Sequence, residues 1–141
     1  MAVLSPFKSE FVESARKVYA ERWQATLERE QFGKVIAVEP STSAVLSGGA
    51  PGAHRMEGMG TGRVVPMWDP SLANGIEAVS TEDAEAMARR LAKEEAIFAG
   101  TSTGANVVAA IRVASQMRPD STVLTIAVDS GLKYVSTELY R

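Results

Sequence analysis

The hexapeptide Gly100-Thr101-Ser102-Thr103-Gly104-Ala105 is the stretch that says most about the fold of this chain. It follows a short apolar segment, residues 97–99, and opens a nearly all-apolar helical run over residues 105–117. Small residues at the start of a helix leave backbone N–H groups open to a ligand, and the helix dipole places partial positive charge there. Ser102 adds a hydroxyl that can donate or accept a hydrogen bond. The hexapeptide therefore predicts a strand-to-helix turn that faces a ligand.

Short apolar runs alternate with helical patterns through the rest of the chain. Helices are predicted over residues 81–95, where Ser80 begins a capping-box pattern, and over residues 105–117. Strands are predicted over residues 35–38, 76–79, 97–99 and 122–128. The last of these is continuously apolar, as in a central parallel strand covered on both faces. The alternation predicts an α/β fold with three layers, in which helices flank a mainly parallel sheet.

Residues 1–33 carry a different pattern. Ser5-Pro6 predicts the start of a helix that runs to about Gln31 and is ended by Gly33. Its apolar stripe recurs at spacings of three and four residues and consists of Phe11, Ala15, Val18, Tyr19, Trp23, Thr26 and Leu27. The sequence thus divides into an N-terminal helix over residues 1–33 and a second region over residues 34–141 that contains the sheet.

Composition excludes several classes of protein. The 141 residues contain no cysteine and one histidine, His54, so disulfides, thiolate metal sites and a serine–histidine triad are not expected, and no metal site is predicted. The net charge of −2 argues against nucleic-acid and anionic-membrane binding. Since no transmembrane run or signal peptide is recognisable, a cytoplasmic location is expected.

Residues 40–75 form a long segment without sustained periodicity. They hold four of the six prolines and seven of the eleven glycines, so no long helix or strand is expected there. An irregular segment of this length inside a compact domain is often functional.

Ordered motifs across residues 34–141 resemble cysteine synthase and its relatives, the fold-type II pyridoxal-phosphate enzymes of the β-family. Order and spacing both match, and together they make the resemblance fairly specific. The motifs are Val38-Glu39-Pro40, Val45-Leu46-Ser47-Gly48-Gly49, Pro51-Gly52-Ala53-His54, residues 57–62, residues 94–105 and residues 129–137. Residues 1–33 show no such resemblance.

The resemblance implies pyridoxal 5′-phosphate as cofactor and assigns roles to seven residues. Ser102 would contact the pyridine nitrogen, with Gly100, Thr101 and Asp129 beside the cofactor, and Gly58, Met59 and Gly60 would form the loop near the substrate. The alternatives from the residues alone are a helix N-cap for Ser102, an ordinary glycine-rich turn at residues 58–60, and strand-end turn chemistry at Asp129. His54 is expected to be structural.

The family reaction implied is β-replacement, in which O-acetylserine or an activated serine loses its leaving group and sulfide adds to give cysteine. The family's cofactor-binding lysine and glycine-rich phosphate cup are not identifiable here, so no catalytic residue is assigned and a truncated domain is expected. A homodimer, or a partner chain that bears the lysine, would follow. The alternatives are a non-catalytic half-domain that binds itself or a partner, and a small-ligand module that keeps a residual pocket at the turn over residues 100–105. The cofactor itself is a group that this chain could have lost.

Overall fold

The computed structural model describes Lys17 and residues 33–141. The chain divides into two compact units. The first comprises Met1–Ala37 and Val64–Gly75, and the second comprises Val38–Arg63 and Ile76–Arg141. The predicted N-terminal helix, and with it the division at residue 33, falls outside the described residues apart from Lys17.

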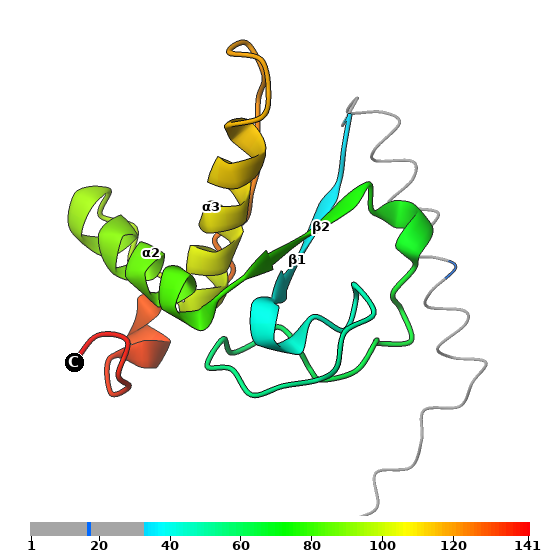
Figure 1. Ribbon diagram of the computed structural model, residues 1–141. Helices are drawn as coiled ribbons and strands as arrows, with labels where there is room; N and C mark the ends of the chain where they lie inside the picture. The colour runs from blue at the N-terminus through cyan, green and yellow to red at the C-terminus, as the bar shows by residue number, and fades with distance from the viewer. Residues whose placement is uncertain (1–16, 18–32) are drawn as a thin grey trace, which may run out of the picture. The chain divides into compact units, whose positions relative to one another are not determined.

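Two strands form a parallel sheet among the described residues: β1, Ile36–Pro40, and β2, Gly75–Val79 (Figure 1). Both confirm strands expected from the sequence. In the first unit, Asn74 fastens the chain next to Val35: its backbone N–H donates to the Val35 carbonyl at 2.7 Å, and its Oδ1 accepts from the Val35 N–H at 2.8 Å. Short 3₁₀ turns, η1 (Ser41–Ser43) and η2 (Pro70–Leu72), interrupt the long irregular segment.

Helix α2, Thr81–Glu94, begins where the sequence predicts. The Ser80 hydroxyl accepts a hydrogen bond from the Asp83 N–H at 3.0 Å and thereby caps the first turn. Glu82 and Asp83 place negative charge at the helix N-terminus, which the helix dipole favours. Its buried face consists of Thr81, Ala84, Ala88 and Leu91.

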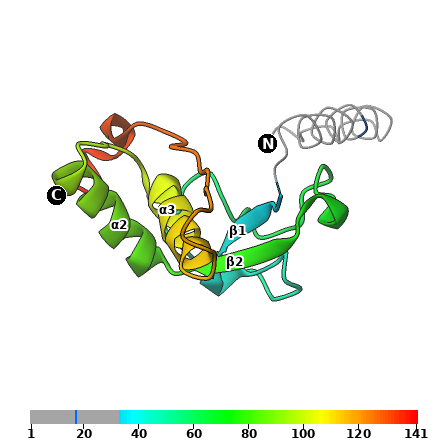
Figure 2. The ribbon, with the colours of Figure 1, turned by 90° about the horizontal axis from the view of Figure 1, so that it is seen from above.

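Helix α3, Thr101–Ala114, packs against α2 (Figure 2). The small side chains of Ala84 and Ala105 let the helices approach closely, and Met56 and Val79 complete the core with Val108 and Ala109. A nearly all-apolar run, as over residues 105–117, predicts a helix buried on most sides. Burial is instead concentrated in the first nine residues of α3, and Ile111 is exposed. No residue of α3 after Ala109 is buried.

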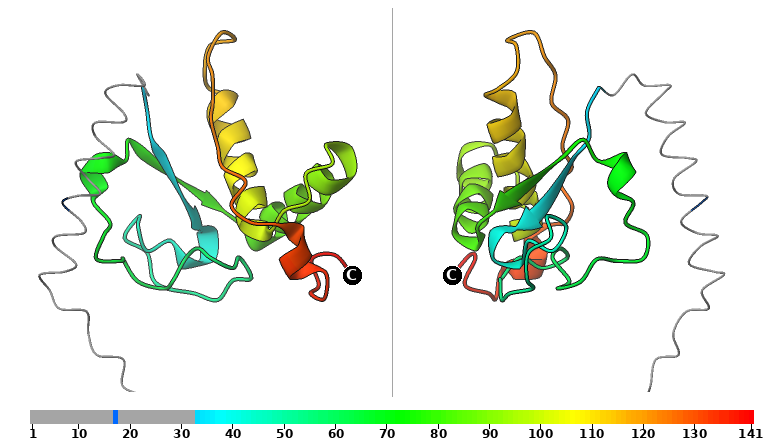
Figure 3. Two further views of the ribbon diagram at one scale, coloured as in Figure 1. Left: turned by 180° about the vertical axis from the view of Figure 1, so that it is seen from behind. Right: turned by 45° about the vertical axis from the view of Figure 1, so that its right-hand side comes forward.

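The two other predicted strands are absent from the described part of the chain. At residues 97–99 there is only an isolated antiparallel bridge between Ala99 and Ser130. Residues 122–128 run back along α3 without strand pairing (Figure 3), held by an Asn106 amide that donates to the Ile126 carbonyl at 3.1 Å. A strand requires a neighbouring strand to accept its backbone hydrogen bonds, and no described residue supplies one. Leu124 and Ile126 are therefore 73% and 68% exposed.

The chain ends in a 3₁₀ turn, η3 (Gly131–Tyr134), and a short tail that packs on α2. Tyr134 and Leu139 form a small cluster with Ala88, and the Tyr140 hydroxyl donates to the Ala99 carbonyl at 2.5 Å. These contacts fix the position of η3 relative to the start of α3. Neither described helix has the length and apolar character needed to cross a membrane.

Candidate functional site

The carboxylate of Asp129 lies at the centre of a polar cluster in the second unit. The Tyr134 hydroxyl, from η3, donates to its Oδ2 at 2.5 Å, and the Ser102 hydroxyl, from the first turn of α3, donates to its Oδ1 at 3.4 Å. The Asp129 carbonyl also accepts from the Gly100 N–H at 3.3 Å. The structure therefore brings together two residues 27 positions apart, Ser102 and Asp129, that the sequence assigns to one site.

Gly100 is the N-cap of α3, and its backbone is packed tightly by this cluster. A Cβ atom at Gly100 would lie 2.4 Å from Asp129 Oδ1 and 2.4 Å from the Tyr134 ring. The helix has no side-chain cap. The alternative interpretation of Ser102 as the N-cap is therefore wrong: Ser102 is the second residue of the helix, and its hydroxyl turns to a carboxylate instead of to a backbone N–H.

Thr101 contributes a buried hydroxyl at the same helix start. The residue is 2% exposed, and its Oγ1 has no hydrogen-bond partner among the described residues. Buried hydroxyls are nearly always partnered, and leaving one unpaired costs about 1–3 kcal/mol. The Thr101 hydroxyl is therefore free to bond a polar group that the described residues do not supply.

Tyr134 keeps its proton firmly. Burial, and then its hydrogen bond to the Asp129 carboxylate, raises the pKa of the phenol well above its ordinary value. Lys133 lies beside the pair, with its Nζ 3.7 Å from Asp129 Oδ2 and 3.5 Å from Glu57 Oε2. The sequence did not single out Tyr134 or Lys133, although both fall within the 129–137 motif that carries the resemblance.

Through Glu57, Lys133 connects the Asp129 cluster to the loop that contains Gly58, Met59 and Gly60. Gly58 and Gly60 have φ angles of 84° and 63°, a region that favours glycine. The predicted substrate loop thus adopts a backbone that explains its two glycines, and a chain of ion pairs joins it to Asp129.

His54 holds this loop with both ring nitrogens. Its Nε2 lies 2.8 Å from the Gly60 carbonyl, and its Nδ1 accepts from the Met56 N–H at 3.3 Å. Because a carbonyl only accepts, these two contacts fit a tautomer in which Nε2 donates to the Gly60 carbonyl and Nδ1 accepts from the Met56 N–H. Both nitrogens are used within the loop, which suits the expected structural role of His54.

Glu39 is a buried carboxylate that sequence reasoning did not select. It accepts hydrogen bonds from the Leu46 N–H at 2.8 Å and from the Ser47 hydroxyl, and it thereby fixes the turn over residues 44–48. Both carboxylate oxygens of Glu39 already accept hydrogen bonds from neighbouring residues, so Glu39 stabilises the fold of this loop. No group of three or more potential metal ligands occurs in the described part of the chain.

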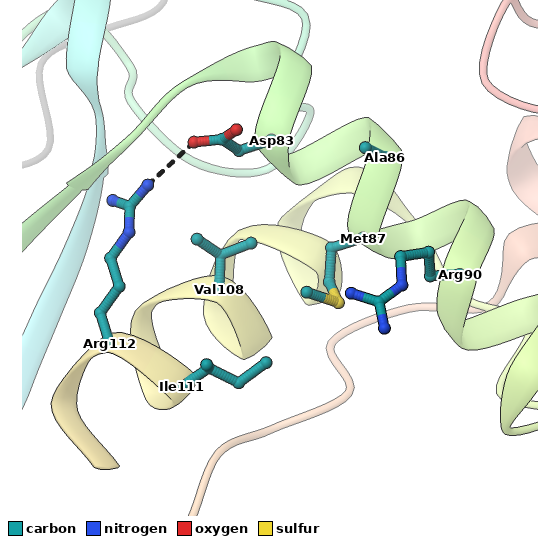
Figure 4. Close-up of a pocket in the computed structure, with 7 residues that line it drawn as sticks. All are labelled: Asp83, Ala86, Met87, Arg90, Val108, Ile111 and Arg112. Atoms are coloured by element: carbon teal, nitrogen blue, oxygen red, sulfur yellow. Dashed lines mark hydrogen bonds and ion pairs between the residues drawn. The ribbon is translucent and has the colours of Figure 1, made fainter. Parts of the chain in front are cut away.

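A groove of about 330 Å³ lies between α2 and α3 (Figure 4). Met87, Val108 and Ile111 lie between the two helices, and an ion pair of 2.8 Å joins Arg112 to Asp83 at one end. The remaining lining residues are Ala86 and Arg90, and the Arg90 guanidinium pairs with Glu94 at 2.9 Å. None of the groove's residues belongs to the Asp129 cluster, and its charges are already paired.

Comparison with known proteins identifies the family. Residues 19–129 match the model of the pyridoxal-phosphate dependent enzyme family. This chain belongs to that family. The matched stretch includes the start of α3 and ends at Asp129, so both partners of the Ser102–Asp129 contact fall inside the family region.

Relatives within the family are cysteine synthases. The chain is 41% identical over 107 residues to cysteine synthase from Staphylococcus aureus, covering 76% of this chain and 34% of that protein. It is 43% identical over 106 residues to a probable cysteine synthase from Bacillus subtilis. The chain spans about a third of the length of these relatives.

Solved structures show the same fold. The crystal structure of cysteine synthase from Entamoeba histolytica superposes with a TM-score of 0.77 at 35% identity, over 84% of this chain and 35% of that one. O-ureido-L-serine synthase superposes with a TM-score of 0.78 at 32% identity, over 84% and 37% of the two chains. The α/β fold expected from the sequence is confirmed as part of a fold-type II pyridoxal-phosphate enzyme domain.

Proposed function

We propose that this chain supplies the ring-nitrogen side of a pyridoxal-phosphate site for cysteine synthase-like β-replacement. The observation that carries the proposal is the convergence of Ser102 and Asp129 at the start of α3, in a chain of this family. The substrate would be O-acetylserine or an activated serine, whose leaving group is replaced by sulfide.

The residues present fit the nitrogen end of the cofactor ring. Ser102 offers a hydroxyl, and Thr101 offers a buried hydroxyl whose hydrogen bond is unmade within the described chain. Gly100 lets the backbone approach Asp129 where any larger residue would collide. When bound, the cofactor supplies an electron sink for negative charge at the substrate Cα.

The residues of this chain would bind the cofactor ring and orient it. Ser102 and Thr101 would hold the ring from the helix start, where the helix dipole adds positive potential. The loop containing Gly58, Met59 and Gly60 would lie on the substrate side, held in shape by His54. Proton removal from the substrate falls to the family's lysine, which the motifs of this chain do not contain. The reaction therefore requires a lysine supplied by another segment or by a partner chain.

The test is a titration of the protein with pyridoxal phosphate, followed by borohydride reduction and peptide mass spectrometry. Binding without a stoichiometric adduct at one lysine is expected, together with no cysteine formation by this chain alone. Ser102→Ala should weaken binding, whereas Ser115→Ala, at the residue that follows the far end of α3, should leave it unchanged. A single stoichiometric adduct at Lys34 or Lys133 would show independent cofactor chemistry, and absence of any binding would contradict the proposal.

A second candidate is a non-catalytic homodimer or partner-binding domain. The observation that favours it is the unpaired segment over residues 122–128, which exposes Leu124, Ile126 and Val128. Exposed apolar patches with free backbone groups commonly mark protein–protein contacts. Self-association without cofactor would support this candidate, and it does not exclude the first.

A further inference from the structure

The predicted substrate loop is anchored at two of its side chains and exposed between them. Met56 is 2% exposed and belongs to the main hydrophobic cluster, and Met59 is half-buried and packs against the same cluster. Glu57 and Gly58, which lie between the two methionines, are exposed. The core therefore holds the base of the loop, whereas the position of its outer part depends on the polar contacts that the outer part makes.

Glu57 makes the contact that ties this loop to the Asp129 cluster. Its Oε2 lies 3.5 Å from the Nζ of Lys133. In the described part of the chain, no other hydrogen bond or ion pair joins residues 57–60 to Asp129, Lys133 or Tyr134. Among these residues the polar connection between the loop and the cluster therefore depends on the pair of Glu57 with Lys133.

Lys133 is presented to Glu57 by an element that is itself held in place. Tyr134, the next residue of η3, is 3% exposed and packs in the small hydrophobic cluster on α2. The Lys133 Nζ also lies 3.7 Å from Asp129 Oδ2 and 5.4 Å from the centroid of the Tyr134 ring. An ammonium in this position attracts both carboxylates and the face of the ring.

The two carboxylates next to Lys133 need its charge. Glu57 and Asp129 both have an oxygen within 4 Å of the Lys133 Nζ, and without the ammonium they would repel each other. The side chains of Glu57 and Lys133 are each 58% exposed, so their pair is weak and is screened by salt. A pair of this strength shifts the balance between a held and a released loop by about twofold to fivefold and does not lock it.

We propose that Lys133 is a positioning residue that holds the predicted substrate loop beside the Asp129 cluster by pairing with Glu57. The position of the loop then depends on a positive charge at residue 133 and not on one side-chain shape. The inference rests on the proposed function for the role of the loop: the held loop is the form that binds O-acetylserine. A weak pair suits this role, because the loop must release for a substrate to enter and leave.

The first experiment follows the loop without any cofactor. The chain contains no cysteine, so Thr61→Cys and Val135→Cys supply two unique attachment sites for spin labels, and both positions are exposed. Pulsed electron paramagnetic resonance then measures the distances between the loop and η3. Lys133→Gln and Glu57→Gln should each raise the population at longer distances about twofold to fivefold. The double variant should raise it no further, since both changes remove the same pair.

Two matched variants and one change of solvent control this measurement. Lys133→Arg keeps the charge and should give the wild-type distances. Lys93→Gln makes the same change as Lys133→Gln at an exposed lysine in the last turn of α2, and it should leave the distances unchanged. Raising the salt from about 0.05 M to about 1 M should act on the labelled wild type as Lys133→Gln does. Unchanged distances in Lys133→Gln, or in the wild type at high salt, would overturn the proposal, as would an arginine that behaves like glutamine.

The second experiment separates substrate binding from cofactor binding. Calorimetric titration with pyridoxal phosphate, and then with O-acetylserine on the loaded protein, measures the two affinities. Lys133→Gln should weaken O-acetylserine binding about twofold to fivefold and leave cofactor binding unchanged, and Lys133→Arg should bind both as the wild type does. Equal weakening of both ligands would overturn the inference. No binding of pyridoxal phosphate by the wild type would overturn the proposed function and the substrate half of the inference, whereas the spin-label distances still decide whether Lys133 holds the loop.

Discussion

Gly104 on α3 lies so close to Ala84 on α2 that a Cβ atom at Gly104 would stand 2.0 Å from the Ala84 carbonyl oxygen. The neighbouring atom belongs to the backbone of a helix, so it cannot move aside as a flexible side chain could. This contact sets the distance between α2 and α3, and it fixes the start of α3, where Ser102 lies.

Gly104→Ala should lower the free energy of unfolding by about 3 kcal/mol, since overpacking against backbone outweighs the helix propensity that alanine gains. Urea unfolding measures the effect. Gly33→Ala is the matched control, because a Cβ there meets nothing within 4 Å. A stable Gly104→Ala protein would show that the helices can separate at small cost.

The sequence predicts an element of this fold correctly when the groups that stabilise that element are close to it in the sequence. The start of α2 is predictable because Ser80 caps an N–H three residues away. Strand pairing over residues 122–128 is predicted from apolar composition alone, and it fails because a strand is completed by a neighbour that composition cannot supply.

The site divides in the same way. The glycines at positions 58 and 60 and the hydroxyl of Ser102 are visible as motif residues, and the family match supports the region that contains them. Ser102 and Asp129 are in contact although they lie 27 positions apart in the sequence. The hydrogen bond from the Tyr134 hydroxyl to Asp129 depends on the packing of η3. No periodicity signals such contacts, so sequence reasoning misses Tyr134 and Lys133.

Gly58 and Gly60 offer a matched pair within the loop. Both have positive φ, so either alanine variant should cost about 1 kcal/mol from backbone strain. At Gly60 a Cβ would also lie 2.4 Å from Pro40 Cγ and 2.7 Å from His54 Nε2, whereas at Gly58 it meets nothing within 4 Å. Gly60→Ala should therefore be the less stable variant by about 1–3 kcal/mol in thermal or urea unfolding. Equal losses would contradict the packing of His54 against this loop.

Tyr134 should make stability depend on pH in the alkaline range. Because burial and Asp129 raise its pKa in the folded protein, the folded state keeps a proton that the unfolded state releases above about pH 10. The contribution is fully present below about pH 10 and falls above it, by up to about 1.4 kcal/mol per pH unit. Burial also raises the pKa of Tyr140.

Urea unfolding between about pH 8 and about pH 11 tests this, with the lower value as the plateau below the unfolded pKa. Tyr134→Phe should show a shallower alkaline decline than the wild type, and the double variant with Tyr140→Phe a shallower one still. Identical slopes for the wild type and Tyr134→Phe would mean that burial and Asp129 do not raise the pKa of Tyr134 in the folded protein.

Replacing Ser102 by aspartate or by asparagine separates the effect of an added charge on stability from the effect of a larger side chain. The aspartate variant would place a second carboxylate beside Asp129, and two like charges about 4 Å apart repel by roughly 1–4 kcal/mol depending on local screening. Ser102→Asp should therefore be less stable than Ser102→Asn at neutral pH. The repulsion raises the folded-state pKa of a carboxyl, so the penalty should vanish below about pH 4 and appear as pH rises. A Ser102→Asp protein as stable as Ser102→Asn at neutral pH would show that Asp129 does not repel a carboxylate at position 102.

The segment over residues 122–128 tests the homodimer. Its alternate residues Leu124, Ile126 and Val128 are 73%, 68% and 56% exposed, and its backbone lacks a strand partner in the described chain. Two copies of the chain could pair along this segment, and a lysine in place of Leu124 or Ile126 would introduce charge into their interface. Sedimentation velocity over a range of protein concentrations should show a dimer for the wild type and a monomer for Leu124→Lys or Ile126→Lys. Val64→Lys, at an exposed valine in the other unit, should remain dimeric. A wild-type monomer at every concentration would contradict self-association, and loss of the dimer in Val64→Lys would place the contact elsewhere.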